Sequence, residues 1–358
     1  EDIFFIEPSC HYVFSKGEIL EKYRYWQYPN KIDLAYSDSV FNELLRDAVL
    51  IRKSSDVGFA VAASSGLDSS IIQSILSENL KTDHDEFVAY CYKDSHFIYD
   101  ELPKAKAIST ALGNNLVPVI LDYSFIDFRN NLSEIVRNAG KGFASKAIIS
   151  YDAMLKKVNQ DGYKVILEGQ GADEILGGYE LLNYSTFFNY FFKKGEFVNV
   201  YKLAVKLIKS PGGLLLKTLN LFRFNIPFFL FRIINSKSKF FKSNYIFRPS
   251  LNLRSIPHDD SINRFLIFQH KSILHELLFY GDIISMKNSV ESRSPFLDHR
   301  LVEYLYRTDS KPKYNPEKGF KAAIRESPYL NSIKDLLNSN KMGFNTTFSP
   351  DLIREMLI

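Results

Sequence analysis

Residues 64–70 (SSGLDSS) form a run of small and hydroxylated side chains between a short apolar segment and a helical pattern. Backbone N–H groups at the start of a helix lack partners within the helix, and serine hydroxyls add donors, so this loop is suited to binding a polyphosphate. Asp68 would repel that anion unless its carboxylate held a magnesium ion. Taken alone, the run is equally typical of a helix N-cap.

A second loop, residues 168–179 (EGQGADEILGGY), also follows an apolar segment. Its glycines permit a tight backbone next to a ligand, and Asp173 and Glu174 begin the next helical segment. An isolated string of this kind can be only a loop with a capped helix. Two acid-bearing glycine loops at the ends of parallel strands nevertheless indicate a ligand site, because open α/β sheets bind ligands at that edge.

Two further strings, residues 282–304 and 321–325 (KAAIR), cannot be assigned a chemistry from their spacing alone. Within the first, Arg293 beside Glu291 predicts a fixed ion pair, and Pro295 predicts a rigid, buried turn. The contribution of both strings to a site depends on where the fold places them.

The segments that must position these strings alternate between strand and helix patterns, which predicts a doubly wound α/β fold with a mainly parallel sheet. Short apolar runs suited to buried parallel strands occur at residues 58–64, 86–92, 116–121 and 164–169. Helical patterns lie between them, and Gly113 is expected to end one of these helices.

Outside this alternating region the character of the chain changes. The first thirty residues indicate a β-hairpin followed by an aromatic linker, and residues 37–51 have apolar side chains at helical spacing. After Gly178 the sequence becomes rich in aromatic residues, with mostly helical segments and few strand signals. A helical C-terminal part is therefore expected to follow the sheet.

Composition limits the class of protein. At 358 residues and 46% hydrophobic content, the chain can bury a large core in one large domain or two smaller ones. Cys10 and Cys91 are too few for a disulfide framework, which favours a reducing compartment and a cytoplasmic location. No secretion signal opens the sequence, so its start is expected to be internal. The longest apolar stretch, residues 214–234, is interrupted by charges and Pro227, so no transmembrane span is predicted.

The net charge of +4 conceals a basic block. Residues 191–254 carry 13 Lys or Arg against the single acid Glu196, which leaves the remainder of the chain net acidic. Such a block is either a solvated helical surface or a contact face for an anionic partner such as an acidic peptide, a glycan or a membrane surface. No RNA-binding signature accompanies the charge, so no nucleic acid partner is expected.

All four strings, in this order and roughly this spacing, resemble the synthetase domain of the asparagine synthetase (glutamine-hydrolysing) family, a PP-loop ATP pyrophosphatase with a HUP-like fold. Relatives of that family include β-lactam synthetases and lasso-peptide cyclases. The resemblance divides the chain into residues 1–32, similar to the end of a glutaminase-like domain plus linker, and residues 33–358, the ATP-binding synthetase domain. Residues 184–280 fall in a region that varies within the family, and they are basic, aromatic and mostly helical.

The resemblance implies roles for individual residues. The pyrophosphate-binding loop would be Ser64, Ser65, Gly66, Asp68, Ser69 and Ser70, with Gly169 and Gly171 also lining the nucleotide site. Asp68 and Asp173 would hold Mg²⁺, and Lys321 matches the catalytic lysine of the family, with Gln170 and Asp173 beside it. The plain alternative for Lys321 is an ordinary surface lysine.

The reaction implied is adenylation of a carboxylate by ATP, with the β-carboxyl of aspartate as the default substrate, followed by displacement of AMP by ammonia or an amine. A second possibility is a synthetase that forms a cyclic or peptide amide on a larger substrate. A third, from a different class, is a nucleotide-binding subunit without catalysis, against which the joint presence of Asp68, Asp173 and Lys321 argues.

Three departures from the family pattern bear on this choice. Ser65 stands where the loop commonly has a second glycine, a mild change if its φ is negative. Gln170 stands where asparagine synthetases usually have glutamate, which removes a negative charge and a general base. The N-terminal cysteine nucleophile of the glutaminase is not in this sequence, and Cys10 is expected to be structural. Ammonia would then come from a glutaminase domain or subunit outside this sequence, or by another route.

Overall fold

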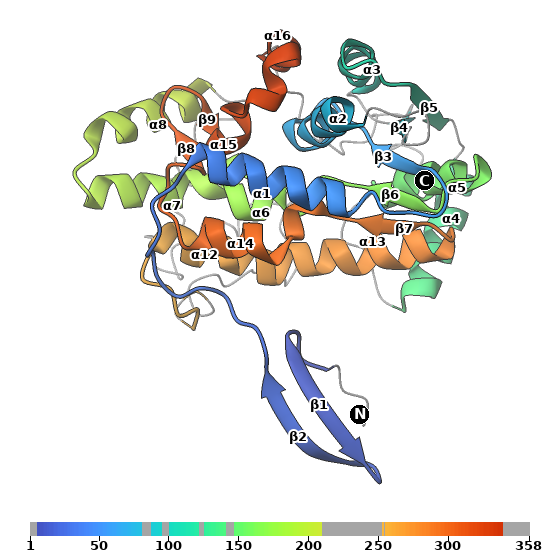
Figure 1. Ribbon diagram of the computed structural model, residues 1–358, viewed down its shortest axis with the longest axis horizontal. Coiled ribbons are helices and arrows are strands. Elements are labelled where there is room, and N and C mark those ends of the chain that lie inside the picture. The colour runs from blue at the N-terminus through green and yellow to red at the C-terminus, as the bar shows by residue number, and fades with distance from the viewer. Residues whose placement is uncertain are drawn as a thin grey trace.

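A computed structural model of the protein describes residues 6–80, 87–94, 100–121, 125–140, 147–209, 253 and 255–338. Within these ranges, no helix combines the length and the apolar character needed to cross a membrane. Figure 1 shows helices packed around a central sheet, with a separate two-stranded hairpin standing away from this body.

The central sheet has five strands in the order β5-β4-β3-β6-β7, and every neighbouring pair is parallel. The strands are β3 (Phe59–Ala62), β4 (Phe87–Asp94), β5 (Leu116–Leu121), β6 (Val165–Leu167) and β7 (Glu291–Arg293). The chain moves outward from β3 to β4 and β5, then returns to the other side of β3 with β6. The predicted doubly wound parallel sheet is confirmed, and its switch point lies between β3 and β6.

Helices cover both faces of the sheet because successive strand residues point to opposite sides. On one face, Phe59 and Val61 of β3 belong to the core that includes α1 (Asp38–Ile51) and α2 (Leu67–Asn79). On the other face, Ala60 of β3 packs in the core that includes α4 (Phe125–Ala139), α5 (Ile148–Gln160) and α13 (His275–Lys287). Helix α3 (Leu102–Ala111) packs beside β4, and Gly113 follows it with φ +74°, as a helix-ending glycine should.

The chain after β6 is mostly helical in the described residues, as predicted. The remaining helical elements are α6 (Ala172–Leu176), α7 (Glu180–Lys193), α8 (Phe197–Lys209), α12 (Ser261–Gln269), the π-helical η1 (His270–Leu274), the 3-10 helix η2 (Pro295–Leu297), α14 (His299–Tyr306), α15 (Ala322–Arg325), the 3-10 helix η3 (Pro328–Ile333) and α16 (Lys334–Asn338). A two-stranded ladder, β8 (Tyr314–Asn315) with β9 (Gly319–Phe320), leads into α15. Most of the basic block 191–254, and residues 210–252 of the variable region, lie outside the described residues.

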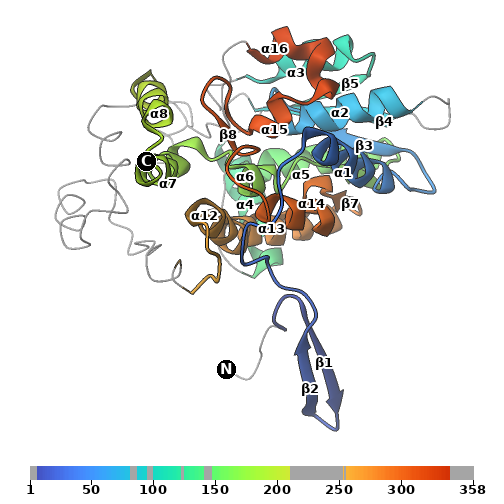
Figure 2. The ribbon, with the colours of Figure 1, turned by 60° about the vertical axis from the view of Figure 1, so that its left-hand side comes forward.

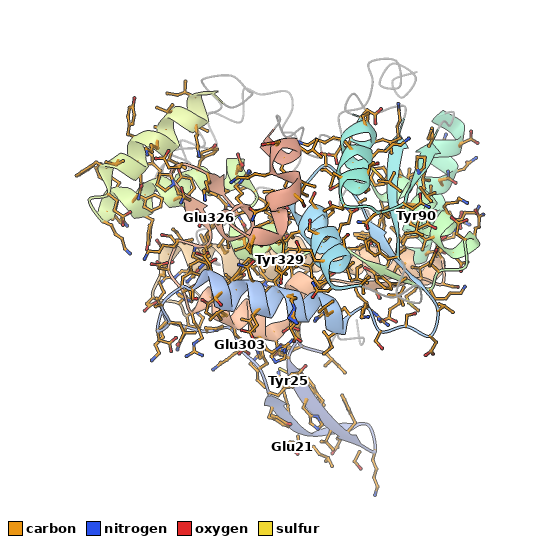
Figure 3. All side chains as sticks on the ribbon, turned by 45° about the horizontal axis from the view of Figure 1, so that its top comes forward. Glu21, Tyr25, Tyr90, Glu303, Glu326 and Tyr329 are labelled. Carbon is orange, nitrogen blue, oxygen red and sulfur yellow. The ribbon has the colours of Figure 1, made fainter. Side chains whose placement is uncertain are left out.

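The predicted N-terminal hairpin is present as β1 (Cys10–Ser15) and β2 (Glu18–Arg24), which pair antiparallel. Figure 2 shows it extending from the body on one side. After it, Trp26 donates a hydrogen bond of 2.6 Å to Glu303, and Figure 3 places Glu303 on the face of the body from which the hairpin extends. The assignment of residues 1–32 to the end of a glutaminase-like domain stays a prediction.

The segment from β7 to α14 is held by a network of arginines and one buried aspartate. Arg293 pairs with Glu291 at 2.8 Å, as predicted, and Pro295 begins a buried 3-10 turn. Asp298 then caps α14 by accepting the Arg300 N–H, and it also forms ion pairs with the Arg300 and Arg52 side chains. These contacts fix β7 and α14 against α1.

We expect Asp298→Asn to lower the free energy of unfolding by about 2 kcal/mol at pH 7, since asparagine keeps the cap but loses two charge-assisted contacts. Burial alone would raise the pKa of Asp298, but hydrogen bonds from Arg300 and Arg52 outweigh it and hold that pKa below its ordinary value. This stabilisation is present above about pH 4 and is lost as the pH falls further. Urea unfolding should therefore show the difference between wild type and variant narrowing below pH 4.

Asp56→Asn is the matched control, because Asp56 is exposed in the bend before β3. It should change stability by less than about 0.5 kcal/mol. A difference for Asp298→Asn that stays constant down to pH 3 would contradict the role of its charge.

Candidate active site

The loop after β3 is tied into a compact turn by its own serines. The Ser64 N–H donates to Ser69 Oγ at 3.1 Å, the Gly66 N–H donates to Ser64 Oγ at 3.1 Å, and the Ser70 hydroxyl donates to the Gly66 carbonyl at 2.6 Å. Ser65 does not have a positive φ, so serine is tolerated where glycine is common. The turn leads directly into α2, a helix of 13 residues. The unpaired N–H groups and the dipole at the N-terminus of such a helix can stabilise a bound anion.

The loop after β6 lies beside it, because β3 and β6 are neighbouring parallel strands. Asp68 in the first turn of α2 and Asp173 in the first turn of α6 both form an ion pair with the ammonium of Lys321. The Nζ to Asp68 distances are 2.7 and 2.6 Å to its two oxygens. The structure thus brings together three residues that the sequence analysis assigns to the site.

Lys321 is a buried residue, with 2% of its surface exposed, so it is not an ordinary surface lysine. Burial alone would lower the pKa of Lys321, but the charges of Asp68 and Asp173 outweigh it and raise that pKa above its ordinary value. Lys321 therefore carries a positive charge throughout the physiological pH range. The pair of carboxylates is what makes a buried ammonium tolerable.

The backbone of Lys321 is left-handed, with φ +57°, a conformation that is uncommon outside glycine. Its N–H donates to the Lys313 carbonyl at 2.9 Å and lies 3.3 Å from the Leu176 carbonyl, and Lys321 is the N-cap residue of α15. These contacts hold the strained backbone and direct the side chain toward the two aspartates. Strain of this kind at a buried lysine with charged partners is typical of functional sites.

Glycines of the 168–179 loop allow the side chains of Asp68, Asp173 and Lys321 to approach its backbone closely. A Cβ at Gly178 would lie closer than 3.0 Å to both the Asp173 carboxylate and the Lys321 side chain. A Cβ at Gly169 would lie 2.7 Å from the Asp68 Cβ, and Gly171 has φ +94°. The predicted nucleotide-site glycines are thus required by packing and backbone conformation, whereas Gln170 between them is exposed.

Two carboxylates near the loops were not assigned a role from the sequence. Glu101 accepts a hydrogen bond of 3.2 Å from the Ser65 N–H, so an acid from the helix after β4 also reaches the first loop. Glu174 is buried and accepts a 2.6 Å hydrogen bond from the Tyr179 hydroxyl. Burial raises the pKa of Glu174 to about 7. The position of Glu101 at a strand-to-helix junction was the available signal, since such junctions meet at one edge of the sheet.

Asp68 and Asp173 fit a magnesium ion by the chemistry of their donors. Both supply the hard oxygen ligands that Mg²⁺ prefers. Both carboxylates also contact the same positively charged atom, the Lys321 Nζ, so the two side chains converge on one centre of positive charge. Within the described residues, no group of three His, Cys, Asp or Glu converges as an all-protein metal cage. Mg²⁺ commonly takes one or two carboxylates and completes its coordination with water and substrate phosphates, which agrees with this donor set.

A family model for asparagine synthase matches residues 40–357. The chain belongs to the asparagine synthase family. It is 26% identical over 366 residues to the glutamine-hydrolysing asparagine synthetase 3 of Bacillus subtilis, with 97% of this chain and 55% of that protein covered. It is 25% identical over 366 residues to the amidase chry2 of Gibberella zeae, with 85% and 52% covered. The resemblance stated from the four strings is confirmed.

This member of the asparagine synthase family spans about half the length of the curated relatives it matches. The matched region includes the sheet, both loops and Lys321. The individual roles of Ser64, Gln170 and the other site residues stay predictions, which variants can test.

We expect Gly178→Ala to displace Asp173 or Lys321 and to lower the free energy of unfolding by about 1–3 kcal/mol, because the added methyl overlaps both side chains. Gly281→Ala in α13 is the matched control, since no atom lies within 4 Å of its new Cβ. Alanine at that helical position should stabilise by up to about 1 kcal/mol. Urea unfolding of the two variants measures both effects, and equal stabilities would contradict the close packing at Gly178.

We expect Glu174→Gln to be more stable than wild type at pH 8, by about 3 kcal/mol at most. The folded pKa of about 7 lies above the unfolded value of 4.5, so the Glu174 contribution to stability is present below pH 4.5 and is lost as the pH rises to about 7. Glutamine has no proton to lose. Chemical unfolding at several pH values should show the two proteins converging toward pH 4.5, whereas Glu180→Gln on the exposed start of α7 should show no such trend.

Proposed function

We propose that the chain is the synthetase part of an ATP-dependent amide-forming ligase, which adenylates a carboxylate and transfers ammonia or an amine to it. The observation that carries this proposal is the buried Lys321 ammonium, bound by Asp68 and Asp173 at the switch point of the sheet, beside the 64–70 loop. The default substrate is the β-carboxyl of aspartate. Membership of the asparagine synthase family supports this choice of reaction.

In the first step, a substrate carboxylate oxygen attacks the α-phosphorus of ATP, and the bond from that phosphorus to pyrophosphate breaks. Backbone N–H groups of the 64–70 loop and the start of α2 bind the pyrophosphate oxygens. Asp68 and Asp173 would hold Mg²⁺, which supplies neutralisation of phosphate charge. Lys321 adds a fixed positive charge where negative charge develops on the leaving group.

In the second step, the nitrogen of ammonia or an amine attacks the carbonyl carbon of the acyl-adenylate, and the carbon–oxygen bond to AMP breaks. The nitrogen loses a proton as the amide forms. Gln170 cannot accept that proton, because an amide side chain is not a base at neutral pH. The nucleophile is therefore expected to arrive as the free base, with its proton passing to solvent or to AMP.

The same chemistry on a larger carboxylate, giving a cyclic or peptide amide, is the second candidate. Gln170 favours it, since the residue is exposed at the edge of the site and is uncharged where asparagine synthetases usually have glutamate. A nucleotide-binding subunit without catalysis is disfavoured by the pairing of the buried Lys321 with two partly exposed aspartates. Ammonia would come from a glutaminase-like domain or subunit, and the protein would act in the cytoplasm, where thiols such as Cys10 stay reduced.

The experiment that tests the proposal is ATP–pyrophosphate exchange with Mg²⁺, using aspartate against a panel of larger carboxylates. We expect Lys321→Ala to reduce exchange by a hundredfold or more, on the order of 3 kcal/mol in transition-state stabilisation. Lys318→Ala is the matched control, because its side chain is exposed and pairs only at the surface with Glu326. It should leave exchange unchanged.

Aspartate-dependent exchange would support asparagine synthesis, and exchange with a larger carboxylate alone would favour the second candidate. Absence of exchange with every carboxylate, in protein that binds ATP, would refute catalysis by this chain alone. Loss of exchange in Lys318→Ala to the same extent as in Lys321→Ala would remove the special role of the buried lysine.

A further inference from the structure

The turn between α7 and α8 exposes apolar side chains that the described structure leaves in water. Phe192, in the last turn of α7, has 57% of its surface exposed, and Phe197, Val198 and Tyr201 at the start of α8 are 63%, 66% and 70% exposed. Figures 1 and 2 both place the two helices side by side at one end of the molecule. Contiguous exposed apolar groups of this kind mark interaction surfaces. We call these four residues the α7–α8 tip.

Two aromatic rings of the tip, those of Phe192 and Phe197, contact each other and a third ring in α7. Phe192 stacks on Phe188 with ring centroids 6.4 Å apart, and it meets Phe197 edge-on at 6.0 Å. The rings therefore form a continuous cluster across the turn that links the helices. A preformed cluster loses little side-chain entropy when it binds a partner.

Helix α8 is apolar on two sides. Leu203 and Leu207 are buried and pack in the core. Phe197 and Tyr201, four residues apart, lie on one line of the helix, with Val198 next to it, and all three point away from that core. A helix that only covered a core would carry polar residues on this outer side. The outer side thus has a composition suited to a second apolar environment.

The charge around the tip is positive. Lys193 and Lys194 occupy the turn directly beside Phe192 and are exposed, and Glu196 is the single acid of residues 191–254. The Lys194 ammonium donates to the Tyr190 hydroxyl of α7 at 2.5 Å, and Lys202 pairs with Glu317, so the charge of Lys202 is directed toward the body.

We propose that the α7–α8 tip docks on the surface of an anionic lipid bilayer. Exposed aromatic and aliphatic side chains beside lysines match both parts of such a surface, the apolar boundary of the acyl chains and the negative headgroups. A purely acidic peptide would pair the lysines but would leave the four apolar side chains in water. A second copy of this chain would bring Lys193 and Lys194 against their own equivalents, which repel.

Docking there would hold the site close to the membrane without occluding the residues proposed for catalysis. Helix α7 runs from Glu180, directly after the glycine loop, to the tip at its other end. Its inner residues Tyr184 and Phe187 pack on Phe320, next to Lys321. The tip and the ammonium of Lys321 are thus connected by one packed helix, with the tip facing outward.

The test is co-sedimentation of the full chain with vesicles of phosphatidylcholine containing roughly a third phosphatidylglycerol, against vesicles of phosphatidylcholine alone. We expect binding to the anionic vesicles that weakens with salt. The double variants Phe197→Ser with Tyr201→Ser, and Lys193→Gln with Lys194→Gln, should each weaken that binding by about tenfold or more. The matched control is Leu20→Ser with Tyr23→Ser, which removes exposed apolar residues from the hairpin.

Pyrophosphate exchange in solution should be unchanged in the tip variants, so failure of the proposed enzyme activity and failure of docking are separate results. Binding that is lost in the hairpin control but not in the tip variants would overturn the proposal. So would binding that survives both tip variants, which would assign the affinity to the basic residues 210–252 alone. No binding to anionic vesicles, with capture of a polyglutamate peptide instead, would overturn the proposal and assign the surface to acidic peptides.

Discussion

The placement of one buried ammonium constrains the whole fold. Lys321 meets Asp68, 253 residues earlier in the chain, and Asp173 on a third segment, so α2, α6 and α15 must converge at one point. A buried charge without its partners costs several kcal/mol, and the ion pairs are therefore formed only when the sheet, both loops and the C-terminal ladder are all in place. The strain of the left-handed Lys321 backbone and the absence of side chains at Gly169 and Gly178 are consequences of the same convergence.

Much of the fold could be predicted because the strands that surround the site are continuous apolar runs. Strands β3, β4, β5 and β6 follow the expected segments, and their helices follow in the expected order. Strand β7 could not be predicted, since its residues Glu291 to Arg293 are polar and its place is set by pairing with β6. Helix α5 carried no prediction either, although its inner face packs in the core that covers β6. Both depend on partners that are distant in the sequence.

The residues of the site also divide into those that local sequence predicts and those that it does not. Asp68 and Asp173 follow from a general property of parallel sheets, since the loops at the carboxyl ends of neighbouring strands meet. Lys321 does not, because a short KAAIR string has no local feature that indicates burial or a positive φ. Its assignment came from the resemblance to a family. Glu101 and Glu174 required the tertiary structure, which alone shows that one reaches the Ser65 N–H and that the other is buried beside Tyr179.

Helix α7 shows how the aromatic richness of this chain serves two separate purposes. On its inner side, Tyr184 and Phe187 hold Phe320, and this contact fixes the residue before Lys321. Substitutions there would misplace the ammonium and would be felt in both stability and catalysis. On its outer side, Phe192 is 57% exposed, and its ring contacts are with Phe188 of α7 and Phe197 of α8. The cost of keeping such rings in water is therefore not offset by the fold, which is the physical reason to seek an apolar partner for them outside the chain.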